Sequence, residues 1–223
     1  MSILVYRDKA TACAAAATMI AAGIIERPSV VLGLDWAQEL KPIYRTLARM
    51  TADGLLDWSD VRAFNLYEHV QTDVDQLAET QLNALLYDGV NILPENRFRP
   101  ATNGRDWGIL CNEYEDAILQ AGGIDTILCA VRADGSVAYN LGAADLAPVT
   151  HVERTEHGRV VTIGMATLMA AKRVVALMTG LDKAEMASRV CTGSITPAVP
   201  ASYLQLHANA VIMREGLAPE GIQ

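Results

Sequence analysis

Short apolar runs alternate along this chain with longer segments whose apolar positions are spaced as in helices. The short runs are rich in β-branched residues, which is typical of strands buried inside a sheet. They predict strands at residues 30–34, 61–65, 124–129, 160–163, 174–178 and 210–213. The longer segments predict helices at residues 11–25, 39–50, 72–87, 106–120, 165–171 and 182–190. This alternation predicts an α/β fold: a doubly wound, mostly parallel, Rossmann-like sheet with helices on both faces.

Residues that start or stop helices support these boundaries. Pro28 follows the first predicted helix and Gly89 the third, where each would end it. Thr72 and Asp182 are expected to cap the N-termini of the third and the last helix. Residues 94–104 are predicted to form a loop. Because the chain has no repeat, linker or change in composition, we expect a single domain over residues 1–223.

Composition limits the classes of function. The chain has 223 residues, of which 51% are hydrophobic and 20% charged, as expected of a globular protein with a sizeable core. Its net charge of −8 disfavours nucleic acid or an anionic membrane as partner, although a local basic site for a small anion remains compatible with it. A small molecule is therefore the expected partner, and homo-oligomer formation is left open.

The location of the protein is predicted from its N-terminal segment and its cysteines. The alanine-rich residues 11–25 are short for a membrane span and lack a preceding basic segment, so they read as a packed helix. The four cysteines have neither close pairing nor the spacing of metal ligands, which favours reduced thiols in a cytoplasmic protein. The histidines also lack metal spacing, and neither a metal nor another cofactor is predicted.

The polar loop at residues 130–140 carries the clearest candidate chemistry. It follows the predicted strand at residues 124–129, and open α/β sheets bind their ligands beyond the carboxyl ends of strands. The loop contains Asp134, Gly135, Ser136 and Asn140. A ligand-binding or catalytic loop is one interpretation, and an ordinary Asp-Gly turn is the other.

Several segments, taken in order, resemble the family of glucosamine-6-phosphate deaminases/isomerases and 6-phosphogluconolactonases. The active-site loop of that family typically reads Gly-x-Gly-x-Asp-Gly-His, followed in the deaminases by Phe-Asn-Glu. Other resembling segments are Phe-Asn-Leu-Tyr-Glu-His at 64–69, Thr-Ile-Gly-Met-Ala-Thr-Leu at 162–168, Gly-Leu-Asp-Lys-Ala at 180–184 and Ser-Tyr-Leu-Gln-Leu-His at 202–207. The segments cover nearly the whole chain and lie nearer to the deaminases than to the lactonases.

The resemblance implies a phosphate-binding turn that begins at Gly33 and is completed by Lys183. In the family this turn is rich in Gly, Ser and Thr and cradles the sugar phosphate with N–H groups and hydroxyls. Here Asp35 and Glu39 would repel a phosphate, and Trp36 would fill space. The alternative interpretation is a plain strand-to-helix turn with acidic residues at the helix start, with Lys183 a solvated lysine.

The resemblance also places substitutions at three family catalytic positions. Tyr67 stands at the position of the aspartate base, Ser136 at that of the histidine and Leu141 at that of its glutamate partner. A phenol of pKa about 10 is a poor base near neutral pH. Glu68 or His69 could replace it, or both could be structural.

Two hypotheses from different classes follow. One is an enzyme of carbohydrate metabolism that acts on a sugar or sugar derivative but does not carry out standard glucosamine-6-phosphate deamination. The other is a catalytically silent protein that binds or senses a sugar derivative. In both, we expect the loops that follow residues 33, 65 and 134 to face one another at one edge of the sheet. The pocket is expected to involve Gly33, Tyr67, Glu68, Asp134, Ser136 and Lys183.

Overall fold

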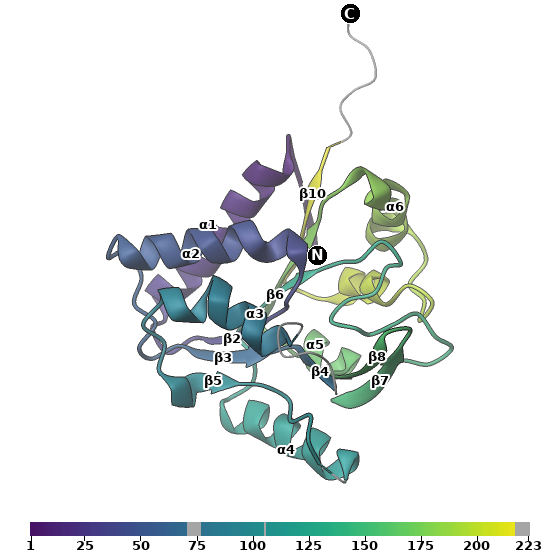
Figure 1. Ribbon diagram of the computed structural model, residues 1–223. Coiled ribbons are helices and arrows are strands. Elements are labelled where there is room, and N and C mark those ends of the chain that lie inside the picture. The colour runs from purple at the N-terminus through teal and green to yellow at the C-terminus, as the bar shows by residue number, and fades with distance from the viewer. Residues whose placement is uncertain (71–76, 105, 217–223) are drawn as a thin grey trace, which may run out of the picture.

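The computed structural model describes residues 1–70, 77–104 and 106–216 of the chain. Its centre is a parallel sheet with the strand order β1-β10-β9-β6-β2-β3-β5. The strands of this sheet are β1 (Ser2–Tyr6), β2 (Val31–Leu34), β3 (Arg62–Asn65), β5 (Arg97–Phe98), β6 (Thr126–Ala130), β9 (Arg173–Met178) and β10 (Ala210–Glu215). The prediction of a doubly wound, mostly parallel sheet is therefore confirmed (Figure 1).

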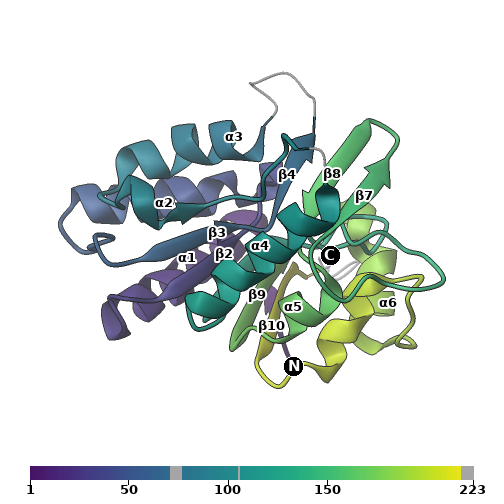
Figure 2. The ribbon, with the colours of Figure 1, turned by 90° about the horizontal axis from the view of Figure 1, so that it is seen from below.

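Helices cover both faces of this sheet (Figures 1 and 2). They are α1 (Lys9–Glu26), α2 (Lys41–Ala52), α3 (Ala78–Leu85), α4 (Trp107–Gln120), α5 (Met165–Met169) and α6 (Ala184–Thr192). Successive residues of the central strands enter different cores, as the two-residue period of a strand requires. In β6, Leu128 packs with α1, α2 and α3, whereas Ile127 and Cys129 pack with α4, α5 and α6.

The first helix is a core element of the fold. Helix α1 is long and apolar enough to cross a membrane by length and composition alone. Its Ala12, Ala16 and Ile20 are nevertheless buried inside the protein, in the same core as α2 and the sheet. Asp8 caps the helix by accepting a hydrogen bond from the Thr11 N–H, at 2.8 Å. These contacts agree with the packed helix predicted from the sequence.

A second, antiparallel sheet was not predicted. It contains β4 (Tyr67–Val70), β7 (His151–Thr155) and β8 (Gly158–Thr162) in the order β4-β8-β7. The apolar run at residues 160–163 thus belongs to this sheet instead of the central one. Figure 2 shows the β7–β8 hairpin beside β4, beyond the end of the central sheet. This sheet forms one wall of the candidate site described below.

Three local predictions need correction. The loop predicted at residues 94–104 contains the short strand β5, which pairs with β3 at the sheet edge. Asp182 does not cap α6, because it lies inside a 3-10 turn at Leu181–Lys183 and α6 begins at Ala184 without a side-chain cap. The helix predicted from residue 39 begins at Lys41, after a 3-10 turn at Gln38–Leu40. The cap predicted at Thr72 lies outside the described residues.

Candidate functional site

The strand order reverses between the neighbouring strands β2 and β6. A crevice beyond such a reversal is the usual ligand position in open α/β sheets. The loop after β2 begins with Asp35, whose Oδ2 accepts a hydrogen bond from the Ala130 N–H at 2.9 Å. The hydroxyl group of Tyr67, at the start of β4, donates to the carbonyl oxygen of Trp36. The ring of Tyr139, from the loop after β6, lies 4.5 Å from that of Tyr67. The predicted convergence of the three loops is confirmed.

A cavity of about 420 Å³ opens beside this junction. Its walls come from β4, from the loop after β6 and from the β7–β8 hairpin. The lining residues are His69, Arg132, Asp134, Tyr139, Leu141, Arg154, Thr155, Glu156 and His157. A volume of this size lies within the range of pockets that bind small molecules.

Lys183 is buried in an ion pair with Glu39. Its ammonium group donates to Glu39 Oε1 at 2.5 Å and to the Val131 carbonyl oxygen at 2.9 Å, and its side chain is 6% exposed. Burial alone would raise the pKa of Glu39, but the hydrogen bond and charge of Lys183, together with the Glu39 backbone N–H and the charge of Lys9, lower this pKa. The Glu39 carboxylate therefore binds the Lys183 ammonium group, to which the resemblance assigns the binding of a phosphate.

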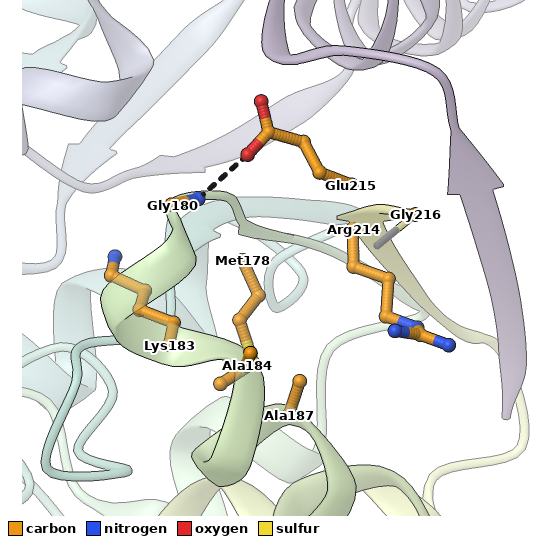
Figure 3. Close-up of a pocket in the computed structure, with 8 residues that line it drawn as sticks. All are labelled: Met178, Gly180, Lys183, Ala184, Ala187, Arg214, Glu215 and Gly216. Carbon is orange, nitrogen blue, oxygen red and sulfur yellow. Dashed lines mark hydrogen bonds between the residues drawn. The ribbon is translucent and has the colours of Figure 1, made fainter. Parts of the chain in front are cut away.

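A small hollow lies on the other side of Lys183 (Figure 3). It has a volume of about 20 Å³, which is room for a single water molecule. Figure 3 shows Lys183 and Arg214 pointing away from each other, while Glu215 accepts a hydrogen bond from the Gly180 N–H at 2.9 Å. This hollow is too small for a sugar, so the larger cavity is the candidate site.

A buried acid, Asp35, interacts electrostatically with a cation of the cavity wall, Arg132. Asp35 is fully buried, and burial raises the pKa of its carboxyl group. Burial would lower the pKa of Arg132, but Asp35 and the nearby Tyr67 and Tyr139 outweigh it and raise this pKa. Asp35 Oδ1 and Arg132 Nη1 are both buried without a hydrogen-bond partner among the described residues. The guanidinium group is therefore charged, and one of its nitrogens is left without a partner.

An aromatic cluster holds this guanidinium group. The Arg132 Cζ atom lies 4.1 Å from the ring centroid of Tyr139 and 5.8 Å from that of Tyr67. Tyr139 has φ 56° and follows Ala138 with φ 48°, a left-handed pair that is unusual for residues other than glycine. The Thr162 hydroxyl group donates to the Ala138 carbonyl oxygen inside this turn. The strained backbone thus sets the Tyr139 ring over Arg132.

Tyr67 and Glu68 lie at the junction but in positions that do not suit proton transfer. Burial, and next the carboxyl group of Asp35, raise the pKa of Tyr67 well above its ordinary value. Both carboxylate oxygens of Glu68 accept backbone N–H groups, from His69, Ala78 and Glu79, at 2.7 to 2.8 Å. Burial raises the pKa of Glu68 in spite of these donors. Its geometry is that of a residue that ties β4 to the start of α3.

His69 and Asp134 are the two predicted catalytic residues that line the cavity. Burial, and next the charge of Arg132, lower the pKa of His69, so its imidazole is neutral near pH 7. Asp134 is exposed, and its Oδ1 accepts the Ser136 N–H at 2.9 Å. Ser136 itself is fully buried, and its hydroxyl group has no partner among the described residues. The cavity thus offers an imidazole and a carboxylate to a ligand.

Three other predicted ligand-binding residues serve packing in this structure. A Cβ atom at Gly33 would lie 2.8 Å from Leu66 and 2.9 Å from Ile127, so only glycine fits there. Gly135 has φ 80°, and a Cβ atom on it would lie 2.8 Å from Val199. Asn140 is buried and donates to the carbonyl oxygens of Val137 and Ile163, at 3.1 and 3.0 Å. They shape the loops of the site.

Trp36 is half-buried at the edge of the junction. Its ring faces the Lys41 ammonium group at 5.2 Å, and its carbonyl oxygen accepts the Tyr67 hydroxyl group. Among the described residues, no group of three or more His, Cys, Asp or Glu side chains could hold a metal ion. The indole does not line the larger cavity.

Arg132 is the residue that the sequence interpretation missed. In the loop pattern Gly-x-Gly-x-Asp-Gly-His, the position two residues before the aspartate is glycine. This chain has Arg132 two residues before Asp134. A large cation at a glycine position of a candidate ligand-binding loop is the signal that could have identified it.

Comparisons with known proteins agree with the fold and the loops. Residues 8–213 match the family model described as glucosamine-6-phosphate isomerases/6-phosphogluconolactonase. A glucosamine-6-phosphate deaminase of Clostridioides difficile (strain 630) is 32% identical over 232 aligned residues, which cover 96% of this chain and 93% of that protein. A glucosamine-6-phosphate deaminase of Arthrobacter sp. (strain FB24) is 29% identical over an alignment that covers 100% of this chain and 93% of that protein.

Two solved structures show the same architecture. A monomeric glucosamine-6-phosphate deaminase superposes with a TM-score of 0.92 at 24% identity, covering 96% of this chain and 97% of that one. A 6-phosphogluconolactonase from Thermotoga maritima superposes with a TM-score of 0.78 at 20% identity, covering 96% and 98%. At these identities the superpositions establish the fold alone.

Proposed function

The chain belongs to the glucosamine-6-phosphate isomerase/6-phosphogluconolactonase family, and from this premise we propose that it acts on a sugar derivative without standard glucosamine-6-phosphate deamination. The ion pair between Lys183 and Glu39 carries this proposal. A phosphate at Lys183 would have to displace a carboxylate held at 2.5 Å in a buried position. Few ligands compensate for breaking such a pair.

The acid and base in this proposal are His69 and Asp134. Tyr67 cannot serve as a base, because its hydroxyl group donates to the Trp36 carbonyl oxygen and its pKa is raised. A neutral imidazole at the cavity wall can accept a proton from a sugar hydroxyl group or from a carbon beside a carbonyl group. The carboxylate of Asp134 can orient a second hydroxyl group of the same ligand.

A second candidate is the catalytically silent binding protein. It is supported by Ser136, a buried residue at the position that the resemblance assigns to the family histidine. A serine without a neighbouring base neither shuttles protons nor acts as a nucleophile at neutral pH. In this version His69 and Asp134 donate and accept hydrogen bonds to a sugar derivative without turnover.

The first experiment measures ammonia release from glucosamine 6-phosphate, with the Clostridioides difficile relative assayed in parallel. We expect release at least about 10²-fold slower than from that relative, because a positioned acid or base typically contributes about 10²–10⁴-fold. Turnover of about 1–10³ s⁻¹, as in ordinary metabolic enzymes, would contradict the proposal.

The second experiment compares binding of glucosamine and glucosamine 6-phosphate by calorimetry. We expect the phosphate group to add no affinity. If the phosphorylated sugar binds more tightly and Lys183→Ala removes the difference, the phosphate-binding turn still works. To separate the two candidates, His69→Gln is compared with the natural protein on any sugar derivative that binds: an enzyme loses turnover, and a silent protein has none to lose.

A further inference from the structure

Arg132 is held by its loop in a fixed position at the cavity wall. Its N–H donates to the Ser136 carbonyl oxygen at 3.0 Å, and its own carbonyl oxygen accepts the Gly135 N–H at 3.0 Å. Asp134 closes the same turn from its side chain. The guanidinium group then lies over the Tyr139 ring at 4.1 Å. A cation that is anchored at both its backbone and its head is pre-organised to bind a ligand.

The charge of this guanidinium group is incompletely satisfied by the protein. Nη1 is buried without a hydrogen-bond partner among the described residues. Asp35 attracts this charge but accepts no hydrogen bond from it, since Asp35 Oδ1 is likewise without a partner among the described residues. A buried charged donor without an acceptor is costly, so the charge of Arg132 remains available to a ligand oxygen at the part of this residue that lines the cavity.

Resting on the proposed function, we infer that the ligand is a sugar acid whose carboxylate binds Arg132. The planar fork of arginine matches the two oxygens of a carboxylate. Asp134 and Glu156 line the same cavity, so a dianionic phosphate meets two carboxylates there, whereas a single negative charge meets less repulsion. Arg154, from β7, adds a second cation to the cavity lining.

The remaining lining residues suit the polyhydroxy part of such a ligand. His69, Thr155 and Asp134 offer donors and acceptors for hydroxyl groups around the cavity. The Tyr139 ring adds an aromatic surface for the carbon skeleton. The carboxylate thus lies near Arg132, apart from the Lys183 ammonium group, which Glu39 already occupies.

Calorimetry with four probes tests this inference: D-glucuronate, D-gluconate, D-glucose and D-glucose 6-phosphate. We expect at least one of the two acids to bind about 10- to 100-fold more tightly than glucose, as a charge-assisted hydrogen bond gives. Arg132→Lys should remove most of that preference, because lysine keeps the charge but lacks the fork. Arg45→Lys, the same change at an exposed position of α2, should leave it unchanged.

Each adverse outcome has a distinct meaning. If glucose binds as tightly as both acids, the sugar-acid inference is wrong while the proposed sugar-derivative function stands. If glucose 6-phosphate binds more tightly than the acids, the argument from the lining carboxylates is overturned. If none of the four probes binds, the sugar-acid inference is wrong. The proposed function then fails with it, except where the protein turns over another sugar derivative, which would support the proposed function alone.

A second measurement does not depend on a folded variant. In the natural protein, the Nε–Hε NMR signal of Arg132, assigned through its backbone, should shift on addition of glucuronate or gluconate and not of glucose. An unchanged Arg132 signal at saturating acid would overturn the inference, even if the acid binds elsewhere.

Discussion

Replacing Glu39 by glutamine tests whether this carboxylate occupies the place of a phosphate. The change keeps the size of the side chain and removes its charge, so Lys183 loses its anionic partner and keeps only neutral acceptors such as the Val131 carbonyl oxygen. We expect two results: a less stable protein, and a new stabilisation by inorganic phosphate.

The loss of stability follows from the burial of the pair. Removing one partner of a fully buried ion pair costs about 3–5 kcal/mol. The Glu39 side chain is 26% exposed, so water partly replaces it and we expect about 2 kcal/mol. For a chain of this size, about 2 kcal/mol corresponds to a melting temperature lower by roughly 4–8 °C.

The gain in phosphate binding follows from the charge left on Lys183. Phosphate at about ten times its Kd would stabilise the Glu39→Gln variant by about 1.4 kcal/mol. Phosphate also stabilises proteins non-specifically, so the assay compares melting in phosphate and in chloride at equal ionic strength. Glu113→Gln, which removes an exposed glutamate of α4, is the matched control and should respond as the natural protein does.

The reasoning is refuted if Glu39→Gln melts at the temperature of the natural protein. It is equally refuted if phosphate raises the melting temperature of Glu39→Gln no more than that of Glu113→Gln. In the first case the ion pair contributes nothing, and in the second the turn after β2 excludes phosphate for reasons other than the Glu39 charge.

Three further predictions concern single residues. Burial lowers the pKa of His69, so the unfolded chain binds a proton at this imidazole more readily than the folded protein does. When the pH falls from about 7 to about 5, the natural protein should therefore lose stability relative to His69→Gln, as measured by urea titration. Gly135→Ala should lower the free energy of unfolding by about 1–3 kcal/mol more than Gly122→Ala does, as measured by urea titration. Both glycines have positive φ, but only at Gly135 would a Cβ atom overlap with close neighbours. Burial would raise the Asp125 pKa, but hydrogen bonds from Lys172 and Val31 and the charges of Arg27 and Lys172 together lower it. Asp125→Asn should therefore show a smaller acid-induced fall in stability than the natural protein below about pH 3.9, which is the ordinary pKa of an unfolded aspartate.

The central sheet could be predicted because its strands are buried on both faces. Residues 174–178 and 124–129 read as continuous apolar runs for that reason. Two of the missed strands are exposed or polar: β7 reads His-Val-Glu-Arg-Thr, and β1 lies at the sheet edge with Val5 54% exposed. Strand β7, which brings Arg154 to the cavity, could not be placed from the sequence, since none of its residues is buried.

The contacts between side chains in the site could not be predicted from the sequence for a different reason. Lys183 and Glu39 are separated by 144 residues, and only the fold shows that they touch. The sequence did indicate that acidic residues after β2 oppose a phosphate. It did not indicate that Lys183 forms an ion pair with one of these acids. Nor did it indicate that the Glu68 carboxylate accepts hydrogen bonds from backbone N–H groups at the start of α3.

The two acidic residues in the turn after β2 each face a cation from another loop. Glu39 binds Lys183 directly, and Asp35 attracts Arg132 electrostatically. Removing Glu39 leaves the buried Lys183 ammonium group without its anionic partner. Restoring a single family residue, such as histidine at position 136, would leave both pairs in place. On the proposed function, we expect histidine at position 136 alone to give no deaminase turnover, because Glu39 would still hold the Lys183 ammonium group.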